Sequence, residues 1–191
     1  FDIIRNLSLS RKEKISLDKK MDMKVLCPVP DLINISYDVL HNEMYKLIDS
    51  LIQEHKTTLI FTNTRSATER VVHHLKEKFP RKYTENIGAH HGSLSKAHRL
   101  NLEERMREGK LKVIVCSTSL ELGIDIGFID LVIMLGSPKS VARATQRAGR
   151  AGHKLHDTIK ARLIALDRDD LVECGILLKN VIERKIDRLH I

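Results

Sequence analysis

Short apolar runs alternate with amphipathic stretches along the chain. The runs are five or six residues long, which is typical of strands buried on both faces of a sheet, and they lie at 23–27, 57–62, 86–90, 111–116, 131–135 and 161–166. Residues 44–52 instead carry apolar side chains at the i, i+3, i+4, i+7 and i+8 spacing of an amphipathic helix. Further helices are predicted at 64–79, 95–108, 139–148 and 168–184. Strands that alternate with helices predict an α/β fold in which helices cover both faces of a parallel sheet.

Capping and helix-breaking residues mark where these helices begin and end. The predicted helix that Pro80 ends is capped at its start by Asn63 or Thr64. The predicted helix that Gly109 ends is capped at its start by Ser93 or Ser95. The acidic run 167–170, with the sequence DRDD, is interpreted as a helix start, because carboxylates stabilise the N-terminal end of a helix dipole. Residues 32–37 are expected to be extended. One face of the last helix is expected to be lined by Leu171, Gly175, Leu178 and Ile182.

The segment 146–153, with the sequence QRAGRAGH, contains the most informative candidate chemistry. Arg147 and Arg150 lie three residues apart among small residues, and on a helix this spacing puts both on one face. An arginine is a fixed cation with a planar fork of donors that suits phosphate oxygens, and in phosphoryl transfer it neutralises charge on the transferred group. The segment by itself leaves a second interpretation open, in which it is an exposed basic helix end without a specific contact.

The segment 116–127, with the sequence CSTSLELGIDIG, carries a second set of polar groups. Ser117, Thr118 and Ser119 follow a predicted strand, and hydroxyls that open a helix there either cap it or donate to an anion. Ligands of open α/β sheets bind at these carboxyl ends of strands. Asp125 lies between two glycines and is a natural acceptor for a sugar hydroxyl. The alternative interpretation is a capped turn with a solvated aspartate.

Four segments resemble ordered motifs of superfamily 2 helicases. They correspond to motif IV, a short motif between IV and V, motif V and motif VI, and they lie at 58–69 (TLIFTNTRSATE), 90–95 (HHGSLS), 116–127 and 146–153. Three segments resemble in particular the Lhr family, the large helicase-related proteins of archaea and bacteria. They are 119–125 (SLELGID), 136–143 (GSPKSVAR) and 166–174 (LDRDDLVEC). The resemblance covers residues 22–191. It implies a RecA-like parallel sheet sandwiched by helices, of the kind found in P-loop NTPase-type helicase C-terminal domains.

The resemblance implies catalytic roles for three residues of the segment 146–153. Arg150 is implied to be the arginine finger that reaches ATP held by another domain. Gln146 is implied to contact the nucleotide or that domain, and Arg147 to join the same network at the domain interface. The implied function is the C-terminal motor half of an ATP-dependent helicase that moves 3′→5′ on single-stranded DNA and unwinds DNA or RNA–DNA duplexes.

The implied cofactors are ATP and Mg²⁺, held mainly by a first RecA-like domain. This chain has no G-x-x-x-x-G-K-[ST] loop for a triphosphate and no Asp-Glu-x-His or Asp-Glu-Ala-Asp run for magnesium. Gly123 is expected to let its turn approach the nucleotide closely, and Asp125 to accept from the ribose. His153 stands where many relatives have a second finger arginine, so a weaker positioning role is expected for it. We expect ATP hydrolysis by the full-length protein and none by this chain alone.

Single-stranded DNA or RNA is the implied partner, beside the first RecA-like domain of the same protein. Hydroxyls, backbone N–H groups at helix starts and one arginine are expected to contact phosphates without reading base sequence. The residues expected in this interface are Thr62, Asn63, Thr64, Arg65, His91, Gly92, Ser93, Ser117, Thr118 and Ser119. Helix capping uses the same atoms and stays open as the alternative for each of them.

Composition sets further limits. The chain has 33 Lys and Arg against 25 Asp and Glu, and its net charge of +8 suits a polyanionic partner. It has no tryptophan and 4% aromatic residues, so backbone contacts are favoured over base stacking. Cys27, Cys116 and Cys174 are isolated, as is typical of reduced thiols in a cytoplasmic protein. No apolar run is long enough to span a membrane, and the first residues carry no apolar signal core.

The histidine pairs at 73–74 and 90–91 raise the question of a metal site. Adjacent histidines on a helix point in different directions, and no cysteine or carboxylate spacing completes a ligand set. We therefore predict no metal site.

Residues 1–21 are lysine-rich and polar and are expected to be a basic lead-in or linker, followed by the helicase C-terminal domain at 22–191. The chain does not begin with methionine and is expected to be a monomeric piece of a longer protein that acts in DNA repair. Two other functions stay open. One is a non-catalytic nucleic-acid-binding RecA-like module. The other is an RNA helicase domain of the Asp-Glu-Ala-Asp kind, although Gln146 stands where that group usually has histidine.

Overall fold

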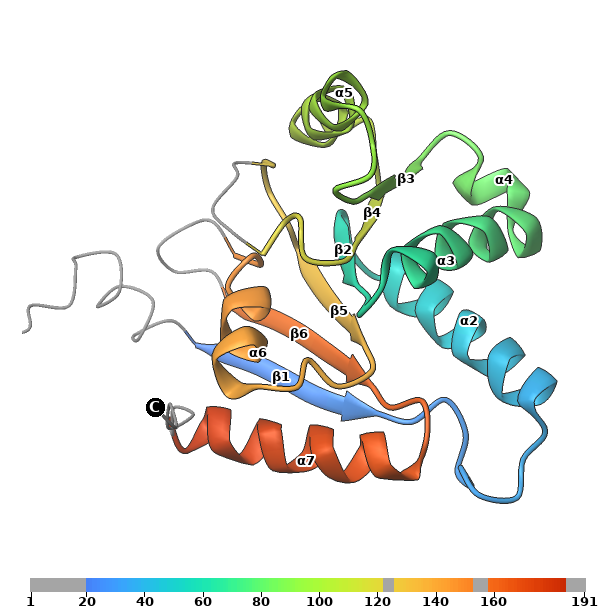
Figure 1. Cartoon of the computed structure of the whole chain (residues 1–191), viewed down its shortest axis with the longest axis vertical. Coiled ribbons are helices and arrows are strands. Elements are labelled where there is room, and N and C mark those ends of the chain that lie inside the picture. Colours follow the sequence, from blue (N-terminus) through green and yellow to red (C-terminus); the bar gives the residue numbers. More distant parts are fainter. Residues whose placement is uncertain (1–19, 122–125, 153–157, 185–191) are drawn as a thin grey trace, which may run out of the picture.

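The computed structural model describes residues 20–121, 126–152 and 158–184, and these residues form a six-stranded parallel sheet (Figure 1). The order of the strands in space is β1-β6-β5-β2-β4-β3, and every neighbouring pair is parallel. The strands are β1 (Met21–Leu26), β2 (Thr58–Phe61), β3 (Ile87–His90), β4 (Val113–Cys116), β5 (Leu131–Leu135) and β6 (Ile159–Ile164). The predicted α/β class and parallel sheet are confirmed.

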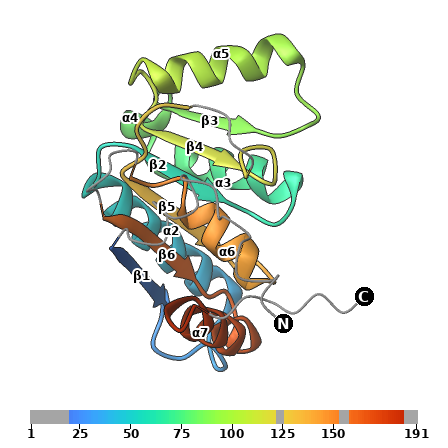
Figure 2. The same cartoon turned by 90° about the vertical axis from the view of Figure 1, so that its left-hand side faces the viewer.

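Helices cover both faces of the sheet, as Figures 1 and 2 show. One face packs against α2 (Tyr37–Gln53), α3 (Arg65–Lys78) and α4 (Pro80–Tyr83). The opposite face packs against α5 (Lys96–Arg107), α6 (Val141–Ala148) and α7 (Arg168–Ile182). None of these helices is long and apolar enough to cross a membrane.

The apolar strands sit at the centre of this three-layer arrangement. Alternate residues of a strand point to opposite faces, so Leu59 and Phe61 enter the core beside α5 and α6, while Ile60 enters the core beside α2 and α3. All three side chains are fully buried. Burying a side chain of this size contributes about 1.5–3 kcal/mol, so the two cores explain why continuous apolar runs form the central strands.

Side-chain caps fix the starts of the helices near the predicted positions. The Thr64 hydroxyl accepts from the Ala67 backbone N–H at the start of α3, and Ser95 does the same for His98 at the start of α5. Of the predicted alternatives, Thr64 and not Asn63 caps α3, and Ser95 and not Ser93 caps α5. The acidic run is confirmed as a helix start, because Asp167 caps α7.

Three local predictions are wrong in the structure. The buried residues of α7 are Cys174, Leu177 and Val181, whereas Ile182 is 70% exposed, so the face that packs on the sheet is a different one from that predicted. Residues 32–37 contain no strand, because the Asp31 carboxylate accepts from two backbone N–H groups and bends the chain. The described residues 117–121 after β4 form turns, not the start of a helix.

Candidate functional site

The residues expected to contact nucleic acid come from three segments that the sheet brings to one edge. Residues 62–65, 90–93 and 117–119 end β2, β3 and β4 or directly follow them, and in a parallel sheet these carboxyl ends lie on the same side. Short contacts join the segments: Arg65 Nη1 donates to Ser93 Oγ at 2.5 Å, and the Ser119 hydroxyl lies 2.7 Å from His90 Nδ1. We call these three segments the carboxyl-edge cluster.

The outer surface of the carboxyl-edge cluster is made of exposed polar residues. These are Asn63, Thr64, Arg65, Ser93 and Thr118, and Gly92 is exposed beside them in the sequence. The Asn63 amide also donates to the Ser137 carbonyl at 3.0 Å, which ties the cluster to the loop after β5. A guanidinium and several hydroxyls on a rigid sheet edge suit contacts to phosphate oxygens, and Arg65 supplies the charge.

Three other predicted contact residues have buried side chains. Thr62 is 1% exposed, and its hydroxyl lies 2.8 Å from that of Thr68. Ser117 is buried, and His91 is buried with Nε2 against the Glu69 carboxylate. The capping alternative holds for Thr64, whose hydroxyl is used by α3. The buried side chains of Thr62, Ser117 and His91 therefore pack beneath the exposed residues of the cluster and are not accessible to a phosphate in this structure.

His90 is a central residue of the carboxyl-edge cluster that the sequence analysis missed. Its ring is 1% exposed and bridges two segments, with Nδ1 2.7 Å from Ser119 Oγ and Nε2 2.8 Å from Glu103 Oε1 on α5. Burial lowers the pKa of His90 below its usual value, although hydrogen bonding and charge from Glu103 oppose that effect. The adjacent histidine pair was the only signal in the sequence, because nothing there links residue 90 to residue 103.

The lowered pKa of His90 predicts a pH dependence of stability. Burial favours the neutral ring in the folded state, whereas the unfolded chain takes up the proton near about pH 6.5. This contribution to the free energy of unfolding is therefore complete above that pH and is lost as the pH falls towards the lower folded pKa. We expect the urea concentration at the unfolding midpoint to decrease as the pH is lowered from about 7.5 to 5.5. His90→Gln, which cannot titrate, should show a shallower fall, and parallel curves for the two proteins would contradict this assignment.

The segment that follows Ser140 contributes a buried arginine. Helix α6 ends at Ala148, so Arg147 and Arg150 do not share one helical face as the spacing predicted. Arg147 is 1% exposed and turns inward, where Nε and Nη2 lie 2.8 and 2.6 Å from Glu121 Oε1. Its guanidinium also lies 5.0 Å from the centre of the Phe61 ring. The structure thus places Arg147 in an internal ion pair, and its expected part in a network at a domain interface stays a prediction.

The surface of the same segment presents Arg143, Gln146 and Arg150. Arg143 and Gln146 are exposed on α6, and Arg150 is half-buried in the turn that follows it. Arg150 Nε is buried and has no hydrogen-bond partner among the described residues. Gly123, Asp125 and His153, the residues expected at the nucleotide, lie outside the described residues. The sequence analysis also missed Glu121, whose charge between the apolar Leu120 and Leu122 was the available signal.

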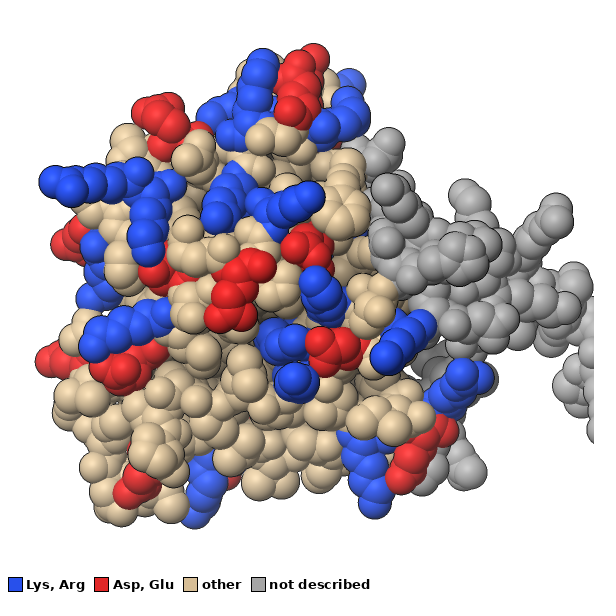
Figure 3. Space-filling view, turned by 180° about the vertical axis from the view of Figure 1, so that it is seen from behind, with Lys and Arg blue, Asp and Glu red and all other residues tan. Residues whose placement is uncertain are grey.

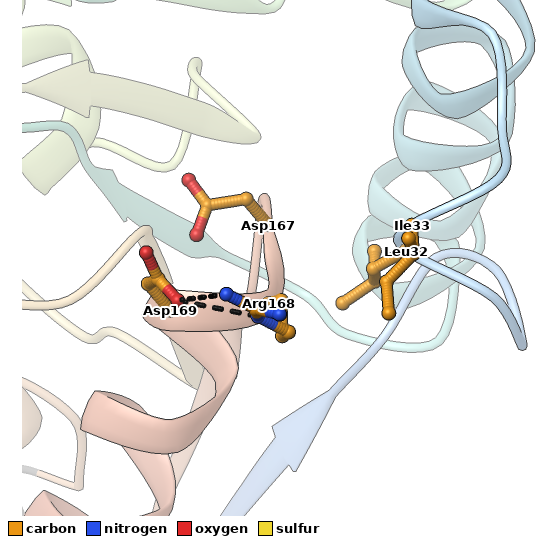
Figure 4. Close-up of a pocket in the computed structure, with 5 residues that line it drawn as sticks. All are labelled: Leu32, Ile33, Asp167, Arg168 and Asp169. Carbon is orange, nitrogen blue, oxygen red and sulfur yellow. Dashed lines mark hydrogen bonds and ion pairs between the residues drawn. The ribbon is translucent and has the colours of Figure 1, made fainter.

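Charge is not gathered into one patch on the face that Figure 3 shows. Basic and acidic side chains are interspersed there, in spite of the net charge of +8. A separate hollow lies between Leu32 and Ile33 on one side and 167–169 on the other (Figure 4). Arg168 is paired with Asp169 in this hollow, and none of the predicted site residues lines it. The carboxyl-edge cluster therefore remains the better candidate for a polyanion.

The family model, the relatives and the solved structure that match this chain are all helicases or helicase domains. A family model described as the helicase conserved C-terminal domain matches residues 37–154. The chain is 53% identical over 178 residues to ATP-dependent helicase Lhr-Core of Methanothermobacter thermautotrophicus, which covers 93% of this chain and 21% of that protein. It is 56% identical over 177 residues to ATP-dependent helicase Lhr-Core protein 2 of Thermococcus barophilus, with 93% and 20% covered. A structure of Mycobacterium smegmatis helicase Lhr bound to ssDNA and AMP-PNP matches with a TM-score of 0.85 and 34% identity, over 91% of this chain and 23% of that one. The chain thus spans about a fifth of the length of the curated relatives it matches.

Proposed function

The chain belongs to the family of helicase conserved C-terminal domains, of the Lhr-like kind, and from that premise we propose that it is the C-terminal motor half of an ATP-dependent 3′→5′ nucleic-acid helicase. The full-length protein would unwind DNA or RNA–DNA duplexes. The observation that carries the proposal is the carboxyl-edge cluster, in which segments that are far apart in the sequence present Asn63, Arg65 and Ser93 at one sheet edge. The similarity to a helicase solved with ssDNA and AMP-PNP supports the same interpretation.

The carboxyl-edge cluster would hold the backbone of a single strand. Arg65 supplies a fixed positive charge, and its hydrogen bond to Ser93 fixes where that charge lies. The exposed Thr118 hydroxyl and the Asn63 amide add neutral polar groups. Contacts of this kind act on phosphate and sugar without reading bases, which is what movement along any sequence requires.

The surface of α6 and the turn after it would face the nucleotide. Arg150 fits an anion there, because it is half-buried and its Nε has no partner among the described residues. Bound ATP with Mg²⁺ would supply the phosphoryl group whose hydrolysis drives the motor. This chain lacks a phosphate loop, so both would be held mainly by a first RecA-like domain of the same protein. Gln146 would contact the nucleotide or that domain. Gly123 would let its turn approach the nucleotide closely, Asp125 would accept from the ribose, and His153 would have a weaker positioning role.

Movement would follow from the changing separation of the two RecA-like domains. In the closed form, Arg150 would reach the transferring group and neutralise its charge. Arg147 would act as a positioning residue, because its ion pair with Glu121 ties the segment after Ser140 to the turn after β4. When the two domains separate again, the ion pair would couple that motion to the carboxyl-edge cluster, which would shift along the nucleic-acid strand.

The proposal is tested by unwinding assays with the full-length protein. We expect unwinding of duplexes with a 3′ single-stranded tail, hydrolysis of ATP stimulated by single-stranded DNA, and little unwinding of 5′-tailed duplexes. Arg65→Ala should weaken single-strand binding several-fold and reduce its salt dependence by about 0.7 in log–log slope, the share of about one phosphate contact. Arg70→Ala is the matched control, since Arg70 is also exposed on α3, and among the described residues its hydrogen bond stays within that helix, to Ser66.

The outcome also separates the proposed motor from a binding module. Salt-dependent binding of single-stranded DNA without any stimulated hydrolysis would contradict the motor and favour the non-catalytic module. Equal effects of Arg65→Ala and Arg70→Ala would remove Arg65 from the interface.

A further inference from the structure

The last two turns of α3 carry two histidines and a glutamate whose ligand atoms converge. His74 Nδ1 lies 3.2 Å from Glu77 Oε2, and His73 Nε2 lies 3.9 Å from the same oxygen. One ligand atom from each residue lies within 4.8 Å of both others. We propose that His73, His74 and Glu77 form a surface site for one Zn²⁺ ion, with a fourth coordination position open to solvent.

Helix geometry explains why the three side chains meet. Successive residues turn by about 100° around a helix, so His74 points about 100° and Glu77 about 40° from the direction of His73. The glutamate therefore lies between the two histidines, one turn further along. The sequence analysis predicted no metal site and did not weigh Glu77, which stands at i+4 from His73 and at i+3 from His74.

The distances and residue types suit zinc. Tetrahedral Zn²⁺ binds imidazole nitrogen and carboxylate oxygen at about 2.0–2.2 Å, which separates neighbouring ligand atoms by about 3.4 Å. The present spacings reach this geometry with small side-chain rotations. The side chains of His73 and Glu77 are 73% and 62% exposed, so an ion has free access and water can complete the tetrahedron. A set of two nitrogens and one oxygen with an open position is also the pattern of Zn²⁺ sites with three protein ligands.

Neighbouring aromatic rings hold His74 in place. The ring of the buried Tyr45 is 5.3 Å from that of His74, and the ring of His41 is 6.0 Å away. Arg70 and Lys78 on the same helix are neighbouring cations that would repel a metal ion. The Lys78 ammonium is directed to Asn42 Oδ1 on α2, at 2.5 Å, and Arg70 Nη1 donates to Ser66 Oγ at 3.0 Å. Because α3 packs on the sheet face opposite α6, the site is separate from the proposed nucleotide surface.

Zinc titration of this 191-residue chain tests the proposal. The chain is first stripped of metal with a chelator, and ZnSO₄ is then added at neutral pH while binding is followed by calorimetry. We expect one ion per chain at these residues, and we expect His74→Ala and Glu77→Gln each to weaken that binding about tenfold or more. His98→Ala, at an exposed histidine on α5, is the matched control and should leave the affinity unchanged. Circular dichroism checks that each variant stays folded.

Ring-nitrogen NMR shifts give an independent readout. Coordination should shift His73 Nε2 and His74 Nδ1 when one equivalent of Zn²⁺ is added. The proposal is overturned if wild-type chain binds no zinc, if the two variants bind as wild type does, or if only other histidines shift.

Discussion

Arg150→Ala in the full-length protein is expected to lower nucleic-acid-stimulated ATP hydrolysis by about 10³–10⁵-fold. An arginine that reaches the transferring phosphoryl group stabilises charge that develops only in the transition state, so its loss acts on kcat. Arg150 is suited to this role because it is half-buried in the turn after α6, which holds the guanidinium stem in place, and its Nε is not used within the described residues. Steady-state ATP hydrolysis with saturating single-stranded DNA measures the effect.

Two comparisons make this result specific. Arg70→Ala removes an arginine from the sheet face opposite α6 and should leave hydrolysis unchanged. Single-strand affinity of Arg150→Ala should also stay close to wild type, because Arg150 lies outside the carboxyl-edge cluster. Hydrolysis at the wild-type rate in Arg150→Ala would show that Arg150 is not the finger.

Arg147→Ala is expected to destabilise the fold by about 3–5 kcal/mol, the usual cost of removing one partner from a buried ion pair. Arg147 is 1% exposed, and Glu121 Oε1 accepts from its Nε and Nη2 at 2.8 and 2.6 Å. Without Arg147, the Glu121 carboxylate at 9% exposure would lose its buried partner, and among the described residues it would keep the more distant Arg143. The guanidinium contact with Phe61 would be lost as well. Urea unfolding of this chain measures the change in free energy.

A double substitution separates the pair from simple loss of packing. Arg147→Met with Glu121→Leu removes both charges while keeping apolar volume, and it should recover much of the stability that Arg147→Ala loses. Lys46→Ala breaks an exposed pair with Glu43 and should cost less than about 1 kcal/mol. A loss below that value for Arg147→Ala would show that the buried pair contributes little to folding.

The central strands and the helix caps were predictable because their signals are local. Strand β5 spans Leu131–Leu135, the same residues as its apolar run, and Thr64 and Ser95 are caps within the predicted alternatives. Helix α7 was predictable only in part. Apolar residues lie on more than one of its faces, and Val172 at 58% exposure and Ile176 at 56% are as hydrophobic as the buried Leu177. Periodicity alone therefore did not decide which face packs on the sheet.

The α/β class and the parallel sheet could be predicted from the order and periodicity of local segments, and the family from ordered motifs. Which polar side chains face outward could not be predicted in this way. Thr62 and His91 turn inward while Asn63 and Arg65 stay exposed, although all four belong to the predicted interface. The physical reason is that a buried polar group needs a partner, and partners such as Glu103 for His90 or Glu121 for Arg147 are fixed by how strands and helices pack and not by the local sequence.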